Sequence, residues 1–88
     1  MQRGWVASAD YQAVIRAIRS IREGKGLSQR ELARRVGKPP SFINKTELRE
    51  RRLDILEFIT LAQAMDMSAI DLLEAVVAAL AASQAQPK

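Results

Sequence analysis

The sequence contains no cysteine and no histidine, and it has only four glycines and three prolines. The missing thiols exclude disulfides and thiolate nucleophiles, and the missing imidazoles remove the commonest general base and the usual zinc ligand sets. No carboxylate pair, phosphate-binding glycine loop or nucleophile–base set is visible either. We therefore expect a protein that is not an enzyme and that binds no metal or cofactor.

Long apolar runs are also missing. No run approaches the roughly 20 residues of a membrane-spanning helix, and residues 1–10 lack the apolar stretch of a secretion signal, so a cytoplasmic location is expected. The chain has 88 residues, of which 48% are hydrophobic and 27% are charged, and this composition is typical of one small globular domain.

Acidic residues are scarce in one half of the chain. Residues 1–53 hold 13 basic and 5 acidic side chains, a balance of +8, whereas residues 54–88 hold one basic and 5 acidic side chains, a balance of −4. Such an asymmetry indicates a half that binds a polyanion and a half with another task. Basic residues that merely solvate helix faces remain the alternative.

Apolar residues recur at three- or four-residue spacing along most of the chain, which is typical of amphipathic helices. We predict an all-α chain with five helices, over residues 9–23, 29–36, 40–48, 55–65 and 69–83. Leu56 and Ile59 are expected to be buried in the fourth helix. Several arginines are expected to face away from the apolar stripes or toward water or a partner: Arg16, Arg19, Arg22, Arg30, Arg34 and Arg35.

Local signals mark the predicted helix ends. Three pairs have the spacing of a capping box, in which two side chains bind backbone N–H groups at a helix start: Ser28 with Glu31, Asp54 with Glu57, and Ser68 with Asp71. Gly37 and Asp66 stand where a helix commonly ends in a left-handed residue. Pro40 suits the first turn of a helix, because its missing N–H would lack an intrahelical partner there.

Two short helices joined by a turn of about four residues form the unit that places its second helix in a DNA major groove. The chain resembles the Xre-like family, the Cro and lambda-repressor-like helix-turn-helix proteins, over about residues 22–73. The resemblance rests on the segments LSQRELA (27–33), VGK (36–38), INKTE (43–47), RRLD (51–54) and LAQAM (61–65). It implies a five-helix domain and a transcriptional regulator, with repression as the expectation from the family.

The outward face of the helix over 40–48 is predicted to read base edges through Pro40, Ser41, Asn44 and Lys45. Family members often carry Gln where this chain has Pro40, which can offer only apolar contact. The resemblance implies that Gln29 contacts the DNA backbone and that Glu47 is bound into the fold. Where many members have Gly, this chain has Arg49, so either the loop runs differently or Arg49 adopts a costly conformation. Further backbone contacts are expected from Arg30, Arg34, Lys38, Arg49, Arg51 and Arg52. For each position, ordinary surface hydration is the alternative.

The last helix is apolar on most sides, which indicates that a second copy of the chain covers part of it. We expect dimer contacts from Leu73, Val76, Val77 and Leu80, although a last core helix with an alanine-rich solvent face is the alternative. The chain then divides into an N-terminal arm (1–9), a helix-turn-helix domain (10–68) and a C-terminal helix with its tail (69–88). In the arm, Trp5 is expected to pack against the first or last helix, and Arg3 could follow the DNA.

The sequence thus predicts a homodimeric, nucleoid-associated regulator that binds a palindromic site in double-stranded DNA. Two alternatives stay open. The chain could be an antitoxin-type autoregulator that holds a toxin with its last helix or tail. It could also be a protein-interaction module without specific DNA binding, in which the basic surface is incidental.

Overall fold

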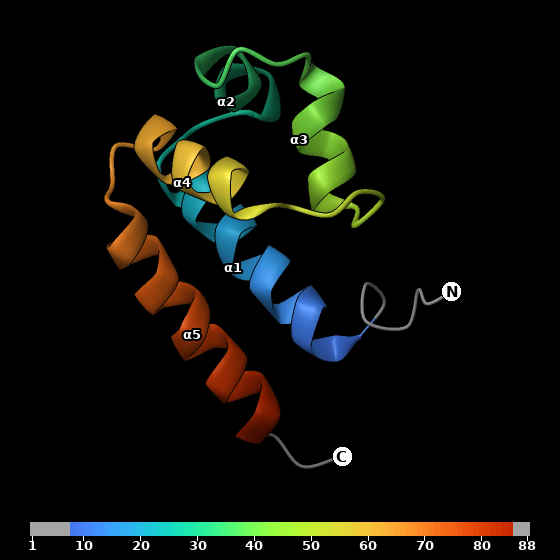
Figure 1. The fold of residues 1–88 in the computed structure, drawn as a ribbon, viewed down its shortest axis with the longest axis vertical. Helices are drawn as coiled ribbons and strands as arrows, with labels where there is room; N and C mark the ends of the chain where they lie inside the picture. Colours follow the sequence, from blue (N-terminus) through green and yellow to red (C-terminus); the bar gives the residue numbers. More distant parts are fainter. Residues whose placement is uncertain (1–7, 86–88) are drawn as a thin grey trace.

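The computed structural model describes residues 8–85, which form five helices and no strand (Figure 1). The helices are α1 (Ala9–Gly24), α2 (Gln29–Arg35), α3 (Pro40–Glu47), α4 (Ile55–Ala64) and α5 (Ala69–Ala85). Each predicted helix is confirmed, with ends that differ by at most two residues. Arg3, Trp5 and the other arm residues before Ser8, with residues 86–88 of the tail, lie outside the described part.

The predicted capping residues explain these bounds. Asp54 and Glu57 form a complete capping box: the Asp54 carboxylate accepts from the Glu57 N–H at 2.7 Å, and the Glu57 carboxylate accepts from the Asp54 N–H at 3.0 Å. Ser28 makes only its half of the predicted box, because the Glu31 side chain binds two arginines instead. The left-handed residues are also confirmed, with φ of 72° at Gly37 and 60° at Asp66.

The core lies where α1 and α5 run side by side in opposite directions, with α4 packed across their upper part (Figure 1). α2 and α3 stand at one end of this assembly and join the same core. The buried apolar side chains come from all five helices and one loop: Ile15, Ile18, Leu27, Leu32, Ala33, Ile43, Leu61, Ala62, Met65, Leu72 and Val76. Among residues 8–85, no helix is long and apolar enough to span a membrane.

Two predictions about burial are wrong. Leu56 is 68% exposed, because the inner face of α4 follows Phe58, Leu61 and Met65, and Leu56 lies outside that stripe. Arg22 was expected away from the core, yet it is only 6% exposed. It stands four residues after Ile18 on the buried face of α1, and its charge is matched there by Glu47.

Candidate nucleic-acid interface

A four-residue turn, residues 36–39, joins α2 to α3. The left-handed Gly37 lets the chain reverse, and the Lys38 N–H donates to the Ala33 carbonyl at 2.9 Å, which closes the end of α2. Ala33 is fully buried where α2 packs on α3, so a larger side chain there would push the two helices apart. This packing fixes the angle at which α3 leaves the domain.

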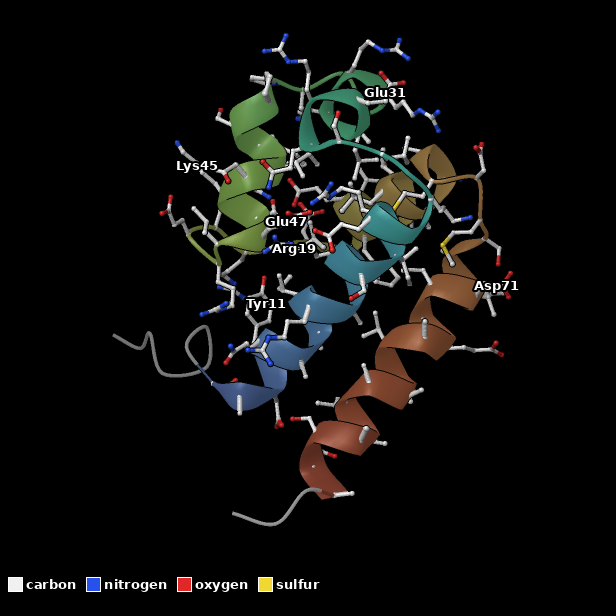
Figure 2. All side chains as sticks on the ribbon, turned by 180° about the vertical axis from the view of Figure 1, so that it is seen from behind. Tyr11, Arg19, Glu31, Lys45, Glu47 and Asp71 are labelled. Carbon is white, nitrogen blue, oxygen red and sulfur yellow. The ribbon has the colours of Figure 1, made fainter. Side chains whose placement is uncertain are left out.

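The outer face of α3 carries the four predicted base-contacting residues, and all of them are exposed: Pro40, Ser41, Asn44 and Lys45. Ile43 and Thr46 on the opposite face are buried, and the Thr46 hydroxyl donates to the Phe42 carbonyl at 2.8 Å. Figure 2 shows the Lys45 side chain pointing away from α1, while Glu47 points toward it. α3 therefore presents one polar, exposed stripe and anchors itself by the other side.

Glu47 is the centre of a buried polar network at the C-terminal end of α3. Its carboxylate accepts from Arg22 Nε at 2.6 Å and Nη2 at 3.1 Å, and from Gln29 Nε2 at 2.8 Å. Arg22 Nη1 also donates to the Leu27 carbonyl at 2.6 Å. The side chains of Arg22 and Glu47 are 7% and 6% exposed. The network ties the end of α1 to the start of α2 and the end of α3, which confirms the structural role expected for Glu47.

Gln29 stands at the first position of α2 and is half-buried. Because one of its two amide N–H groups is engaged by Glu47, the orientation of the whole amide is set by the buried network. The second N–H and the carbonyl oxygen make no hydrogen bond to residues 8–85. An amide held in this way beside a helix N-terminus can donate to an anion.

Some of the basic side chains predicted to contact DNA are held by carboxylates. Arg34 makes a bidentate pair with Glu31, with its shorter contact at 2.6 Å. The hydrogen bonds from Arg34 and Arg35 lower the pKa of Glu31 to about 2. Arg51 pairs with Glu57 at 2.8 Å, and this hydrogen bond lowers the pKa of the Glu57 carboxyl. The Arg51 guanidinium also stacks 4.5 Å from the centroid of the Phe42 ring.

The remaining basic side chains of this surface differ in their surroundings. Arg30 and Lys45 are exposed and have no ion-pair partner within residues 8–85. The Lys38 ammonium lies 5.5 Å from the Phe42 ring on the turn between α2 and α3. Arg49 adopts the left-handed conformation, with φ of 62°, so the costly alternative predicted from the missing glycine is confirmed. Arg52 is exposed on the same loop.

Two arginines have roles that the sequence reasoning missed. Arg22 follows Ile15 and Ile18 at helical spacing, and a charge at such a position signals a buried partner, but the partner is 25 residues away. Arg35 was expected to face water or a partner, whereas its Nη1 donates to the Ala64 carbonyl of its own chain at 2.9 Å. It thereby binds the C-terminal end of α4, where a cation is favoured by the helix dipole.

The chain matches a helix-turn-helix family model over residues 18–72, more than half of its length. It is similar to the structure of an XRE-family like protein from Pseudomonas syringae pv. tomato str. DC3000, with 40% identity, a TM-score of 0.73, and coverage of 80% of this chain and 85% of that one. It is also similar to the structure of the clp gene regulator ClgR from Corynebacterium glutamicum, with 27% identity and a TM-score of 0.75. That match covers 85% of this chain and 80% of the ClgR chain. No curated protein matches it. The chain therefore belongs to the XRE-like family of helix-turn-helix DNA-binding transcriptional regulators.

Proposed function

We propose that this protein is a homodimeric repressor that acts in the cytoplasm on the nucleoid, where it covers a palindromic operator in double-stranded DNA. The observation that carries the proposal is the exposed stripe of α3, which is polar, ends in a cation and lies opposite a buried anchoring face. Two such helices, one from each copy, would enter successive major grooves of one DNA face. Repression would be steric, because a bound dimer covers the promoter.

Base reading is assigned to the outer face of α3. Ser41 can donate to or accept from several base edges, Asn44 can pair with adenine, and Lys45 can reach the acceptors of guanine. Pro40 offers apolar contact, for example to a thymine methyl group. All four residues are exposed on the described chain, which supports this assignment.

Backbone contacts are assigned to the side chains around this stripe: Gln29, Arg30, Arg34, Lys38, Arg49, Arg51 and Arg52. The orientation of the Gln29 amide by Glu47 supports its role as a phosphate donor. Arg34 and Arg51 would have to exchange or share their contacts with Glu31 and Glu57, so we expect them to add less affinity than Arg30 or Lys38.

The dimer contact is assigned to the exposed flank of α5. Leu73 and Val77 are 51% and 54% exposed, and Ile70, one turn before Leu73, is 70% exposed. Leu80 is half-buried at the edge of the same flank. Val76, which we also expected in the dimer contact, is 6% exposed because it packs in the core of its own chain, so it is withdrawn from the proposal. Exposed apolar residues in a row on one helix are typical of a surface that a partner covers.

The test of DNA reading is a pair of variants titrated with specific and random duplexes at several salt concentrations. Lys45→Ala should relax or shift sequence preference, whereas Arg52→Ala should weaken binding to all duplexes and flatten the log–log salt slope by about 1. Specific sites selected from a random pool should bind roughly 10³-fold or more tightly than random DNA. Equal affinity for every DNA sequence would refute the proposal that the protein is a sequence-specific repressor.

The apolar flank of α5 also favours a second candidate function, an antitoxin-type autoregulator in which a toxin covers this flank. A protein-interaction module without specific DNA binding would use the same surface. Sedimentation of the purified chain separates these from the homodimer: the dimer is expected to dissociate in Val77→Asp, which places a charge on the flank and leaves the core intact. A monomer at all concentrations would refute the homodimer.

A further inference from the structure

An apolar groove opens between α1, the start of α4 and α5. It has a volume of about 320 Å³ and is lined by Tyr11, Val14 and Ile15 of α1, by Leu53 and Asp54 before α4, by Ile55 and Phe58 of α4, and by Leu73 of α5. Ile55 is 74% exposed and Leu73 is 51% exposed at its rim. Among the lining residues that the structure describes, Asp54 alone is charged. Apolar side chains from three helices therefore face a space that residues 8–85 do not fill.

The size of the groove indicates a single large side chain as its occupant. A stable contact with another protein usually buries about 800 Å² on each partner, far more than this groove offers by itself. One tryptophan buries about 150–250 Å² and prefers aromatic neighbours in offset or edge-to-face geometry. Tyr11 and Phe58 supply two aromatic rings here, out of four aromatic residues in the whole sequence.

The groove lies within reach of the only tryptophan. Ser8 caps α1, and Tyr11, in the first turn of that helix, already lines the groove. Trp5 precedes Ser8 by three residues, which span at most about 10 Å when extended. The residues that follow α5 at the other end, Gln86, Pro87 and Lys88, include no aromatic or long aliphatic side chain.

We propose that Trp5 packs into this groove in its own chain. The indole would contact Tyr11, Phe58 and Leu73, and so join the start of α1 to α4 and α5. It would cover the groove side of Leu73 and leave Ile70 and Val77 of α5 open. The docked segment would thereby define one edge of the flank to which the dimer contact is assigned.

Because Trp5 is the only tryptophan, the intrinsic fluorescence of the full chain reports on it alone. Its emission is expected to be blue-shifted from that of the urea-unfolded chain and protected from acrylamide, equally at all protein concentrations. Ile55→Gln and Leu73→Gln, which make the groove polar, should shift the emission to the red and raise the quenching. Both positions are exposed, so the core stays intact, and far-ultraviolet circular dichroism checks this.

Two matched controls lie beside these positions and outside the groove. Leu56→Gln changes the next residue of α4, which is 68% exposed, and Val77→Gln changes the next turn of α5, which is 54% exposed. Both should leave the emission of Trp5 unchanged. The proposal is overturned if the native emission equals that of the unfolded chain, or if groove variants and controls respond alike. Emission that depends on protein concentration would also overturn it, and would assign the groove to a second copy.

Discussion

Removing the carboxylate of Glu47 should destabilise the whole domain. In Glu47→Ala the Arg22 guanidinium stays in a site where its side chain is only 7% exposed, without its counter-charge, and Gln29 loses its acceptor. Breaking one side of a buried ion pair typically costs about 3–5 kcal/mol, whereas a domain has only about 5–15 kcal/mol in total. At roughly 4–8 °C per kcal/mol for this size, Tm should fall by about 12–40 °C.

Urea unfolding followed by circular dichroism measures this change, with an unchanged m-value as the sign that the unfolded state is comparable. Arg22→Met combined with Glu47→Leu is the informative partner variant, because it removes both charges and fills similar volume. Its free energy of unfolding should fall by much less than the sum of the losses in the two single variants. Two results would contradict this account of the ion pair. The first is a loss of less than about 1 kcal/mol in the free energy of unfolding of Glu47→Ala. The second is a loss in the double variant that equals the sum of the losses in the two single variants.

The same residue should also affect DNA binding through Gln29. Glu47→Gln keeps a hydrogen-bond acceptor beside the Gln29 amide but removes the charge that Arg22 balances. At a temperature where the variant is folded, we expect weaker binding to all duplexes, as after Gln29→Ala, and an unchanged sequence preference. A shifted preference would indicate that the network acts on α3 and not on the phosphate contact.

Three further perturbations follow from single contacts. Arg49→Gly should keep or raise Tm, because relief of left-handed strain of about 1–2 kcal/mol offsets the greater freedom of the unfolded chain, while the salt slope of DNA binding falls by about 1. Acidification should destabilise the protein as pH falls below the ordinary glutamate pKa of 4.5, because Arg51 lowers the pKa of Glu57 in the folded protein. In Glu57→Gln, the free energies of unfolding measured in urea at pH 7 and pH 3 should therefore differ less than in the wild type. Asp54→Ala should lower stability by about 1 kcal/mol in the same urea assay, and no loss would show that the capping box is dispensable.

Capping residues and apolar spacing were sufficient to predict the helices, because the ends of a helix depend on neighbouring residues. The Asp54 and Glu57 carboxylates act within one turn, and the N–H of the left-handed Gly37 donates to the Arg34 carbonyl three residues earlier, at the end of α2. The exposed stripe of α3 was also predictable, since Ile43 and Thr46 fix which side faces the core. Wherever the determining contact lies within about four residues, spacing alone is enough.

Contacts between distant residues were not predictable in the same way. Arg35 reaches the end of α4, about 30 residues later, and no local pattern distinguishes it from Arg34, which faces water beside it. Leu56 is a large apolar residue of the kind usually found in a core, but the rotation of α4 about its axis turns it outward. Both outcomes depend on how whole helices pack, which the sequence pattern of one helix does not encode.

The arrangement of charge explains how a modest net value can serve a DNA-binding surface. Of the five acidic residues in the basic half, Glu47 is buried against Arg22, and Glu31 and Glu23 are held by arginines of their own helices. Because these carboxylates are engaged by arginines, they do not neutralise the exposed stripe of α3, where Lys45 has no ion-pair partner within residues 8–85. Adding an acid at Ser41 would therefore oppose DNA binding in two ways, because the new carboxylate would repel the phosphates and would lie four residues before Lys45 on the same stripe, where it can pair with that cation.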